Sequence, residues 1–179
     1  GASAYVDPPD ELWSLMTGTD LELFGLMGAR TAEMHLALAR PTRDPAFAAE
    51  PFSRLYQRSV YQTMQSSMKK VMTQLERGRS GLDEGARAEA DAIREARSRC
   101  LEIFHRFHAS TIRCLKLRIH GEFHLAHLLS TGKDFVVIDF EGNPERPLPE
   151  RRIKRSPFRD LADMQRSIFD TAWEALDNS

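Results

Sequence analysis

The sequence is poor in cysteine and has no long hydrophobic run. Its only two cysteines, Cys100 and Cys114, belong to no paired motif, so we expect reduced thiols instead of a disulfide framework or a cysteine metal site. No apolar stretch approaches the roughly 18 residues that cross a bilayer, and no signal-peptide pattern is seen. We therefore expect a soluble, cytoplasmic protein with no membrane partner.

A charge excess of either sign is also missing. The 25 basic and 26 acidic residues leave a formal net charge of −1 at pH 7, which gives no electrostatic reason to expect nucleic acid as a partner. A chain of 179 residues with 41% hydrophobic content suits a single domain, which would bury roughly 70% of its unfolded surface.

The phosphate-binding loops of many nucleotide-binding proteins are absent from the sequence. Gly25-x-x-Gly28 and Gly78-x-x-Gly81 follow no predicted strand, and Gly132-Lys133-Asp134 lacks the upstream glycine and the Ser or Thr of a P-loop. There is no Gly-rich flap and no strand with a phosphate-binding lysine. Any nucleotide-dependent chemistry of this chain would therefore need a second lobe to complete its cleft.

What the sequence does contain is mainly helical periodicity. One helix is predicted from the capping box Thr19–Glu22 to just before Pro41, two more over 53–77 and 83–109, and a last one from Ser156-Pro157. The last helix is expected to turn a small set of side chains inward and to be anchored by a bulky aromatic residue near its end: Leu161, Met164, Ile168, Ala172 and the anchor Trp173.

Two short segments have the patterns of strands. Leu115–Ile119 alternates between apolar and basic residues, and Phe135–Ile138 is apolar and rich in β-branched residues. Thr131–Asp134 is typical of a turn. We predict a mainly α (α+β) fold with four long helices and a short β-hairpin around residues 115 to 139.

The segment that links these strands has the layout of a phosphotransferase catalytic loop. Glu122 follows the first strand, His127 lies five positions further on, and Asp139 closes the second strand. In kinase-type chemistry the first position accepts the proton of the attacking hydroxyl, and the other two hold the Mg²⁺ that bridges the nucleotide phosphates. Glu122 is therefore the predicted catalytic base, His120 shapes the loop, and Asp139 and His127 are predicted metal ligands.

The motifs around this loop resemble the C-terminal lobe of bacterial maltokinases, above all the maltokinase domain of trehalose synthase fusion proteins. The resemblance runs from about residue 20 to 176 and implies a two-lobed fold similar to protein kinases and aminoglycoside phosphotransferases. It implies phosphorylation of maltose at the anomeric hydroxyl, with ATP and Mg²⁺. The matching motifs are Arg30–Leu38, Glu50–Phe52, Tyr56–Ser59, His120–Leu125, Ile138–Arg152 and Lys154–Asp160.

The same resemblance implies partners and a sugar site. Residues 1–18 would be a lead-in and residues 19–179 the C-terminal lobe, so the N-lobe and a trehalose synthase domain are expected partners. This chain alone is expected to be inactive, and an exposed inter-lobe face would allow homo-oligomers. Sugar binding is assigned to charged residues after Asp139, for which a solvated linker is the alternative: Glu141, Arg146, Arg151 and Lys154.

The chain departs from the maltokinase pattern inside the loop. Glu122, Ala126 and His127 stand where that family carries Asp, Gly and Gln. Glu keeps the acid but moves it by one methylene, and His offers an imidazole in place of an oxygen ligand suited to Mg²⁺. Three functions stay open: a maltokinase-type lobe serving trehalose and glycogen metabolism, a degenerate non-catalytic module for structure or partner binding, and a separate metal site. That site would use Glu122, His124, His127 and Asp139.

Overall fold

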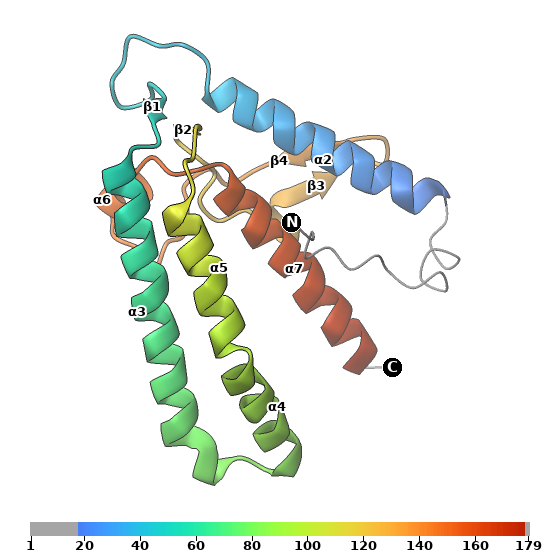
Figure 1. Cartoon of the computed structure of the whole chain (residues 1–179). Coiled ribbons are helices and arrows are strands. Elements are labelled where there is room, and N and C mark those ends of the chain that lie inside the picture. The colour runs from blue at the N-terminus through green and yellow to red at the C-terminus, as the bar shows by residue number, and fades with distance from the viewer. Residues whose placement is uncertain (1–17, 178–179) are drawn as a thin grey trace. The chain divides into compact units, whose positions relative to one another are not determined.

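The structure is a computed structural model that describes residues 18–177, with side chains described for residues 18–175. Of the predicted lead-in, all but Gly18 lies outside the described residues. The chain divides into two compact units, which we call the loop unit (residues 18–50 and 116–177) and the helical unit (residues 51–115). The helical unit is an insertion in the sequence between the two parts of the loop unit (Figure 1).

The loop unit contains two long helices, α2 (Gly18–Leu38) and α7 (Phe158–Asp177), and the short helix α6 (Leu148–Arg151). A 3₁₀ turn, Leu125–His127, leads into β3 (Leu128–Ser130), which pairs antiparallel with β4 (Phe135–Val137) in the register Leu129↔Val136. Two further short strands, β1 (Glu50–Pro51) and β2 (Leu115–Lys116), form a second two-stranded pair.

The core of the loop unit is centred on the predicted catalytic loop. Phe123 is 0% exposed and packs in one cluster with Met34 of α2, Leu128 of β3 and Met164 of α7. Burying a side chain of this size contributes roughly 2–3 kcal/mol. Helices distant in sequence are thus held together by an apolar residue of the loop itself.

The helical unit is an antiparallel helical hairpin. α3 (Arg54–Gly78) lies beside α5 (Arg97–Ala109), and α4 (Glu84–Glu95) precedes α5 (Figure 1). Ser53 caps α3, because its hydroxyl accepts a hydrogen bond from the backbone N–H of Tyr56 at 3.2 Å.

Several details of the predicted elements are wrong. The helix predicted over 83–109 is two helices, because Ala96 has a ψ of −11°, far from the α-helical value of about −42°. The hairpin has β3 as its first strand, and the strand predicted over 115–119 is only two residues long. Leu117 then forms a single bridge with Arg155.

Two further predictions are wrong: which side chains of the last helix are buried, and which residue caps the first helix. Trp173 is not an anchor within this chain, since it is 68% exposed, and Leu161 and Ala172 are exposed as well, whereas Met164 and Ile168 face the core. Gly18 already belongs to α2, so Thr19 is not its N-cap. The predicted fold class, mainly α with a short β-hairpin, is confirmed. None of the helices in the described range is both long and apolar enough to cross a bilayer.

Candidate active site

One buried carboxylate fixes the backbone of the predicted catalytic loop. Asp160, in the first turn of α7, is 0% exposed. Its Oδ2 accepts a hydrogen bond from the backbone N–H of His120, and its Oδ1 from that of Gly121, both at 2.9 Å. Gly121 has a φ of 85°, which costs glycine little. The two bonds define the path of the chain immediately before Glu122.

His35 of α2 completes the surroundings of this carboxylate. Its Nε2 lies 2.9 Å from Asp160 Oδ2, and its side chain is largely buried. Since an ionised carboxylate only accepts, Nε2 is the nitrogen that carries the proton. Three donors thus compensate for the burial of the Asp160 carboxylate, and they come from α2 and from the loop.

His120 is a structural centre of the loop. It is 1% exposed; its Nε2 donates to the carbonyl of Ile138 at 2.7 Å, and its Nδ1 accepts from the N–H of Glu122 at 3.4 Å. Burial lowers the pKa of His120 below its usual 6.5. The ring is therefore neutral near pH 7 and has both nitrogens occupied, which suits a role in shaping the loop.

His127 contacts the backbone of the predicted base. Its Nδ1 lies 2.7 Å from the carbonyl oxygen of Glu122, and its ring stacks against that of His124 with 3.9 Å between centroids. Its backbone N–H donates to the carbonyl of His124 at 2.9 Å, and its carbonyl accepts from the N–H of Ile138 at 3.1 Å. His127 is therefore held in place both through its backbone and through its imidazole ring.

Asp139 lies next to this imidazole, as the metal prediction requires. It lies two residues after the end of β4, has a φ of 60°, and its side chain is 63% exposed. Non-glycine residues rarely adopt such a φ, and when they do they are often at functional sites. Asp139 Oδ2 lies 3.7 Å from His127 Nε2. One carboxylate and one imidazole fit a divalent cation whose other positions are filled by phosphate oxygens and water.

A groove of about 420 Å³ opens beside the loop within the loop unit. Glu122 and His124 line it from the loop, and the carboxylate of Glu122 makes no hydrogen bond or ion pair with any side chain in the described part of the chain. Burial raises the pKa of Asp163 in this groove. The remaining charged lining residues are Arg146, Arg159, Arg166, Asp170 and Glu174.

The predicted sugar-binding residues are only partly brought together. Arg146 lines the groove with Glu122, whereas Arg151 lines an adjoining cavity of about 20 Å³, roughly the size of one water molecule. Arg151 Nη1 lies 3.5 Å from the carbonyl of Glu141, whose own side chain is exposed. Lys154 lines neither cavity and instead forms an ion pair of 2.6 Å with Glu50.

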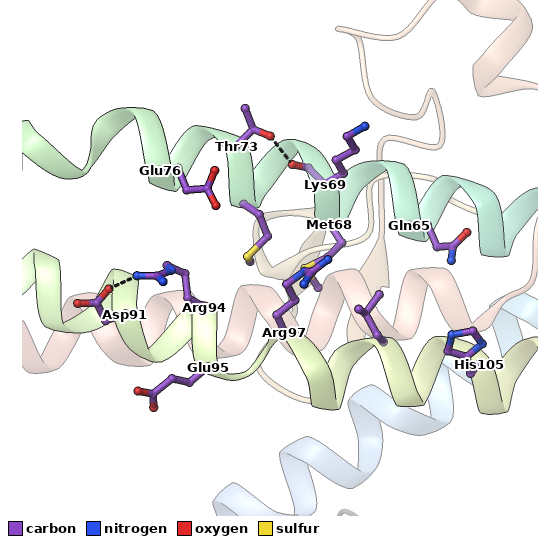
Figure 2. A pocket seen from close by; sticks show the side chains of 12 residues that line it. Gln65, Met68, Lys69, Thr73, Glu76, Asp91, Arg94, Glu95, Arg97 and His105 are labelled. Carbon is purple, nitrogen blue, oxygen red and sulfur yellow. Dashed lines mark hydrogen bonds and ion pairs between the residues drawn. The ribbon is translucent and has the colours of Figure 1, made fainter.

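A larger cavity, of about 890 Å³, belongs to the helical unit and contains none of the predicted site residues. Figure 2 shows it between α3 and the α4–α5 pair, with an ion pair of 2.8 Å between Arg94 and Asp91 on its wall. Its mixed lining, from Lys69 and Arg97 to Glu76, gives it no single charge preference.

The separate metal site built from four side chains has no support in the structure. Among the described residues, no group of three or more His, Cys, Asp or Glu side chains is arranged to hold a metal ion. The two-residue pair Asp139 and His127 stays a prediction.

The sequence reasoning missed the residues that position the loop. Asp160 belongs to the matching motif Lys154–Asp160, but nothing in its spacing distinguishes a buried carboxylate from an exposed one. The hydrogen-bond partner of His35 is 125 positions away in the sequence, so no local pattern indicates it. Asp163, which also lines the groove, carries no sequence signal that distinguishes it from other acidic residues of the last helix.

Comparison with known proteins gives the fold its context. No protein-family model matches the sequence. The chain is 27% identical over 146 residues to a glucosamine kinase from Streptacidiphilus jiangxiensis, an alignment that covers 79% of this chain and 28% of that protein. The chain thus spans less than a third of the length of this relative.

Solved structures of glucosamine kinase share the same architecture. One in complex with glucosamine, ADP and inorganic phosphate aligns with a TM-score of 0.60 and 21% identity, covering 79% of this chain and 31% of that one. A second crystal form gives a TM-score of 0.69 and 19% identity, covering 91% and 36%. The chain has the fold of a kinase C-lobe. The similarity supports a kinase-like fold and does not single out maltokinases or trehalose synthase fusions.

Proposed function

We propose that this chain is the acceptor-side lobe of an ATP-dependent sugar kinase and that Glu122 is its catalytic base. The observation that carries the proposal is the position of Glu122. Asp160 holds the two preceding backbone N–H groups, and Glu122 then lines a groove of about 420 Å³ without a side-chain partner in the described residues. This volume is within the usual range for a small-molecule site. A free carboxylate in such a groove can accept the proton of a sugar hydroxyl.

The nucleotide side of the reaction needs groups outside this groove. ATP with its divalent metal, when bound, supplies the phosphoryl group, and Asp139 with His127 would hold the metal. A kinase cleft takes phosphate contacts from both lobes, so a nucleotide-binding N-lobe is part of the proposal and residues 19–179 are its C-lobe. Glu122 would orient the sugar hydroxyl and take its proton as the oxygen forms a bond to the γ-phosphorus of bound ATP, the bond from that phosphorus to the bridging oxygen breaks, and ADP leaves.

An amino sugar is the acceptor that we propose. The lining of the groove includes four carboxylates, those of Glu122, Asp163, Asp170 and Glu174, against three arginines, of which Arg159 and Arg166 form ion pairs with Asp163 and Asp170. A sugar ammonium group would offset the cost of the partly buried Asp163 carboxylate, whose pKa burial raises. The similarity to glucosamine kinases supports the same choice.

Maltose is the second candidate. The motifs His120–Leu125 and Ile138–Arg152 resemble maltokinases, and on that basis the chain would act with a trehalose synthase domain. Arg146 is the predicted sugar-binding residue that lies in the groove with Glu122, so it is the side chain that either sugar would meet.

The first test is sugar binding by this chain. Glucosamine, glucose and maltose are titrated into isotope-labelled protein, and amide shifts around Glu122 and Asp163 are followed. We expect glucosamine to bind more tightly than glucose by on the order of tenfold, because one charge-assisted contact is added. Weaker binding of glucosamine than of maltose would select the second candidate, and no shifts with any sugar would overturn the proposal.

The second test is phosphoryl transfer by a protein that carries this chain together with a nucleotide-binding lobe. Glu122→Gln should lower the transfer rate by on the order of 10²- to 10⁴-fold, as loss of a general base does, and leave sugar affinity within a few-fold. The control is Glu145→Gln in the exposed loop before α6. Sugar binding without any transfer by the unmodified protein would instead support a degenerate, non-catalytic module.

A further inference from the structure

We propose that His127 and Asp139 form a nitrogen–oxygen chelate that selects a transition-type divalent cation, such as Mn²⁺ or Co²⁺, over Mg²⁺. The inference deepens the proposed function, on which its place in a phosphotransfer site depends. The geometry of the two side chains carries it independently of any sugar.

The protonation of His127 follows from its hydrogen bond. The carbonyl oxygen of Glu122, 2.7 Å from Nδ1, can only accept, so Nδ1 carries the proton. In a neutral imidazole the other nitrogen is then an acceptor. The lone pair of Nε2 therefore faces outward from the loop, toward Asp139.

Two acceptors consequently face each other. His127 Nε2 and Asp139 Oδ2 are 3.7 Å apart, beyond the length of a hydrogen bond. A cation about 2.1 Å from each atom would place them roughly 3 Å apart when they occupy neighbouring positions. The exposed Asp139 side chain can make that adjustment, whereas the ring of His127 is held by its contacts with Glu122 and His124.

The identity of the donors decides which metal is preferred. Mg²⁺ takes oxygen ligands almost exclusively, whereas imidazole nitrogen suits transition-type ions such as Fe²⁺, Ni²⁺ and Zn²⁺. Within that class the affinity of a nitrogen–oxygen site rises from Mn²⁺ through Co²⁺ along the Irving–Williams series, so Mn²⁺ is the weakest binder of the group. Two protein ligands leave most of the coordination sphere for water or phosphate oxygens, as in nucleotide-dependent sites. Among the described residues no third His, Cys, Asp or Glu is placed to complete a metal site with this pair, which fits such an open site.

The tautomer is tested first on the metal-free chain. Long-range proton–nitrogen correlation spectra should show His127 with its proton on Nδ1. A proton on Nε2 would overturn the proposal, because that nitrogen could not bind a metal.

Metal binding is tested by titrating MnCl₂, CoCl₂ and MgCl₂ separately into the same chain without nucleotide or sugar. Mn²⁺ should broaden the His127 and Asp139 signals selectively, and its affinity should exceed that of Mg²⁺ by on the order of tenfold. Equal affinities for the two ions, or broadening away from this pair, would overturn the proposal.

Two variants and one control complete the design. His127→Gln, which supplies an oxygen, should lower Mn²⁺ affinity about tenfold and remove the preference over Mg²⁺. Asp139→Asn changes an exposed residue and should weaken binding of both ions. His105→Gln, on an exposed position of α5, should change neither. A preference for Mn²⁺ that survives in His127→Gln would overturn the chelate.

The two proposals fail separately. A chain that binds Mn²⁺ through this pair but binds no sugar retains the chelate and loses the sugar-kinase function. A chain that binds glucosamine but shows no preference among the metals retains the function and loses the chelate.

Discussion

The carboxylate of Asp160 accepts hydrogen bonds from the backbone N–H groups of His120 and Gly121, each with a donor–acceptor distance of 2.9 Å. A side chain of α7 thereby determines where Glu122 lies, because these two residues directly precede it in the chain. The carboxylate is 0% exposed, so water cannot take its place as acceptor for the two N–H groups if Asp160 is altered. The geometry of the loop is therefore a property of the helix that packs behind it.

Asp160→Asn should destabilise the chain by about 3 kcal/mol, since the amide NH₂ would face a backbone N–H that loses its acceptor. Denaturation followed by circular dichroism measures this, and amide hydrogen exchange at His120 and Gly121 should become faster. Asp170→Asn is the control, because it removes only an exposed ion pair with Arg166, worth less than about 0.5 kcal/mol. Equal effects of the two variants would contradict the assigned role.

His35→Leu should also destabilise the loop unit, by about 1–3 kcal/mol, because Asp160 would keep its charge and lose one donor. Combined with Asp160→Asn it should be strongly non-additive, since both residues belong to one network. Leu36→Ala, at a position 70% exposed, is the matched control on α2. Additive costs in the double variant would show that His35 acts elsewhere.

The helices could be predicted because local sequence determines where they begin and end. The strand pairing and the exposure of single residues could not, because they depend on residues elsewhere in the chain. Ser53 and Gly78 bracket α3 almost as the sequence predicts, because a cap and a glycine act within one turn. The partner of β4 is β3, only four residues before it, yet Leu128–Ser130 is too short for a strand pattern. Trp173 was placed inward by its type alone, while its exposure depends on what packs beside α7.

The residues of the candidate site also fall into those that local spacing predicts and those that it does not. Glu122, His127 and Asp139 could be chosen from their spacing along a loop between two strands. The structure brings His127 and Asp139 close together. The hydrogen bond between Asp160 and His35 could not be predicted, because these residues are 125 positions apart in the sequence. A buried carboxylate that accepts three hydrogen bonds leaves no periodic signal in the sequence.

His120 should titrate with a midpoint below 6.5, because burial lowers its pKa. The unfolded chain, with His120 near its usual pKa of about 6.5, then binds more protons than the folded one between the two values. The contribution of His120 to stability is therefore complete above about pH 6.5 and is lost as pH falls through the folded pKa. Carbon-detected histidine titration measures the midpoint, and the same titration in urea is the control. A folded midpoint above the urea value would refute this.

Gln57→Leu should destabilise the helical unit by about 2–3 kcal/mol, because the buried amide of Gln57 supplies hydrogen bonds to the carbonyls at the end of α5 that leucine cannot replace. Gln57 is 1% exposed, donates to the carbonyls of Phe107 and Ser110, and accepts from Arg54 at 2.8 Å. Gln62→Leu, at an exposed position of the same helix, should change stability by less than about 0.5 kcal/mol. Denaturant unfolding of both variants measures the difference, and a Gln57 variant as stable as the control would exclude this network as a stabilising element.

Glu122→Asp combined with His127→Gln should raise Mg²⁺-dependent sugar phosphorylation in a protein that carries this chain with a nucleotide-binding lobe. Asp shortens the reach of the base by one methylene toward the kinase pattern that the loop resembles, and a displacement of about 1 Å can change the rate on the order of 10²-fold. Gln returns an oxygen ligand for Mg²⁺ opposite Asp139. Both changes act on one phosphoryl transfer, so the pair should exceed the product of the single effects.

The measurement is sugar phosphate formed from glucosamine and from maltose across the four variants, each with Mg²⁺ and with Mn²⁺. Replacing Mg²⁺ by Mn²⁺ should help the unmodified protein most and the double variant least, because only the former keeps the imidazole ligand. If the unmodified protein is fully active with Mg²⁺ and the double change cripples it, Glu122 and His127 are a catalytic pair adapted to each other. Their contact through the Glu122 carbonyl would then be the reason, since moving the base and removing the ring that supports it would disturb the same loop twice.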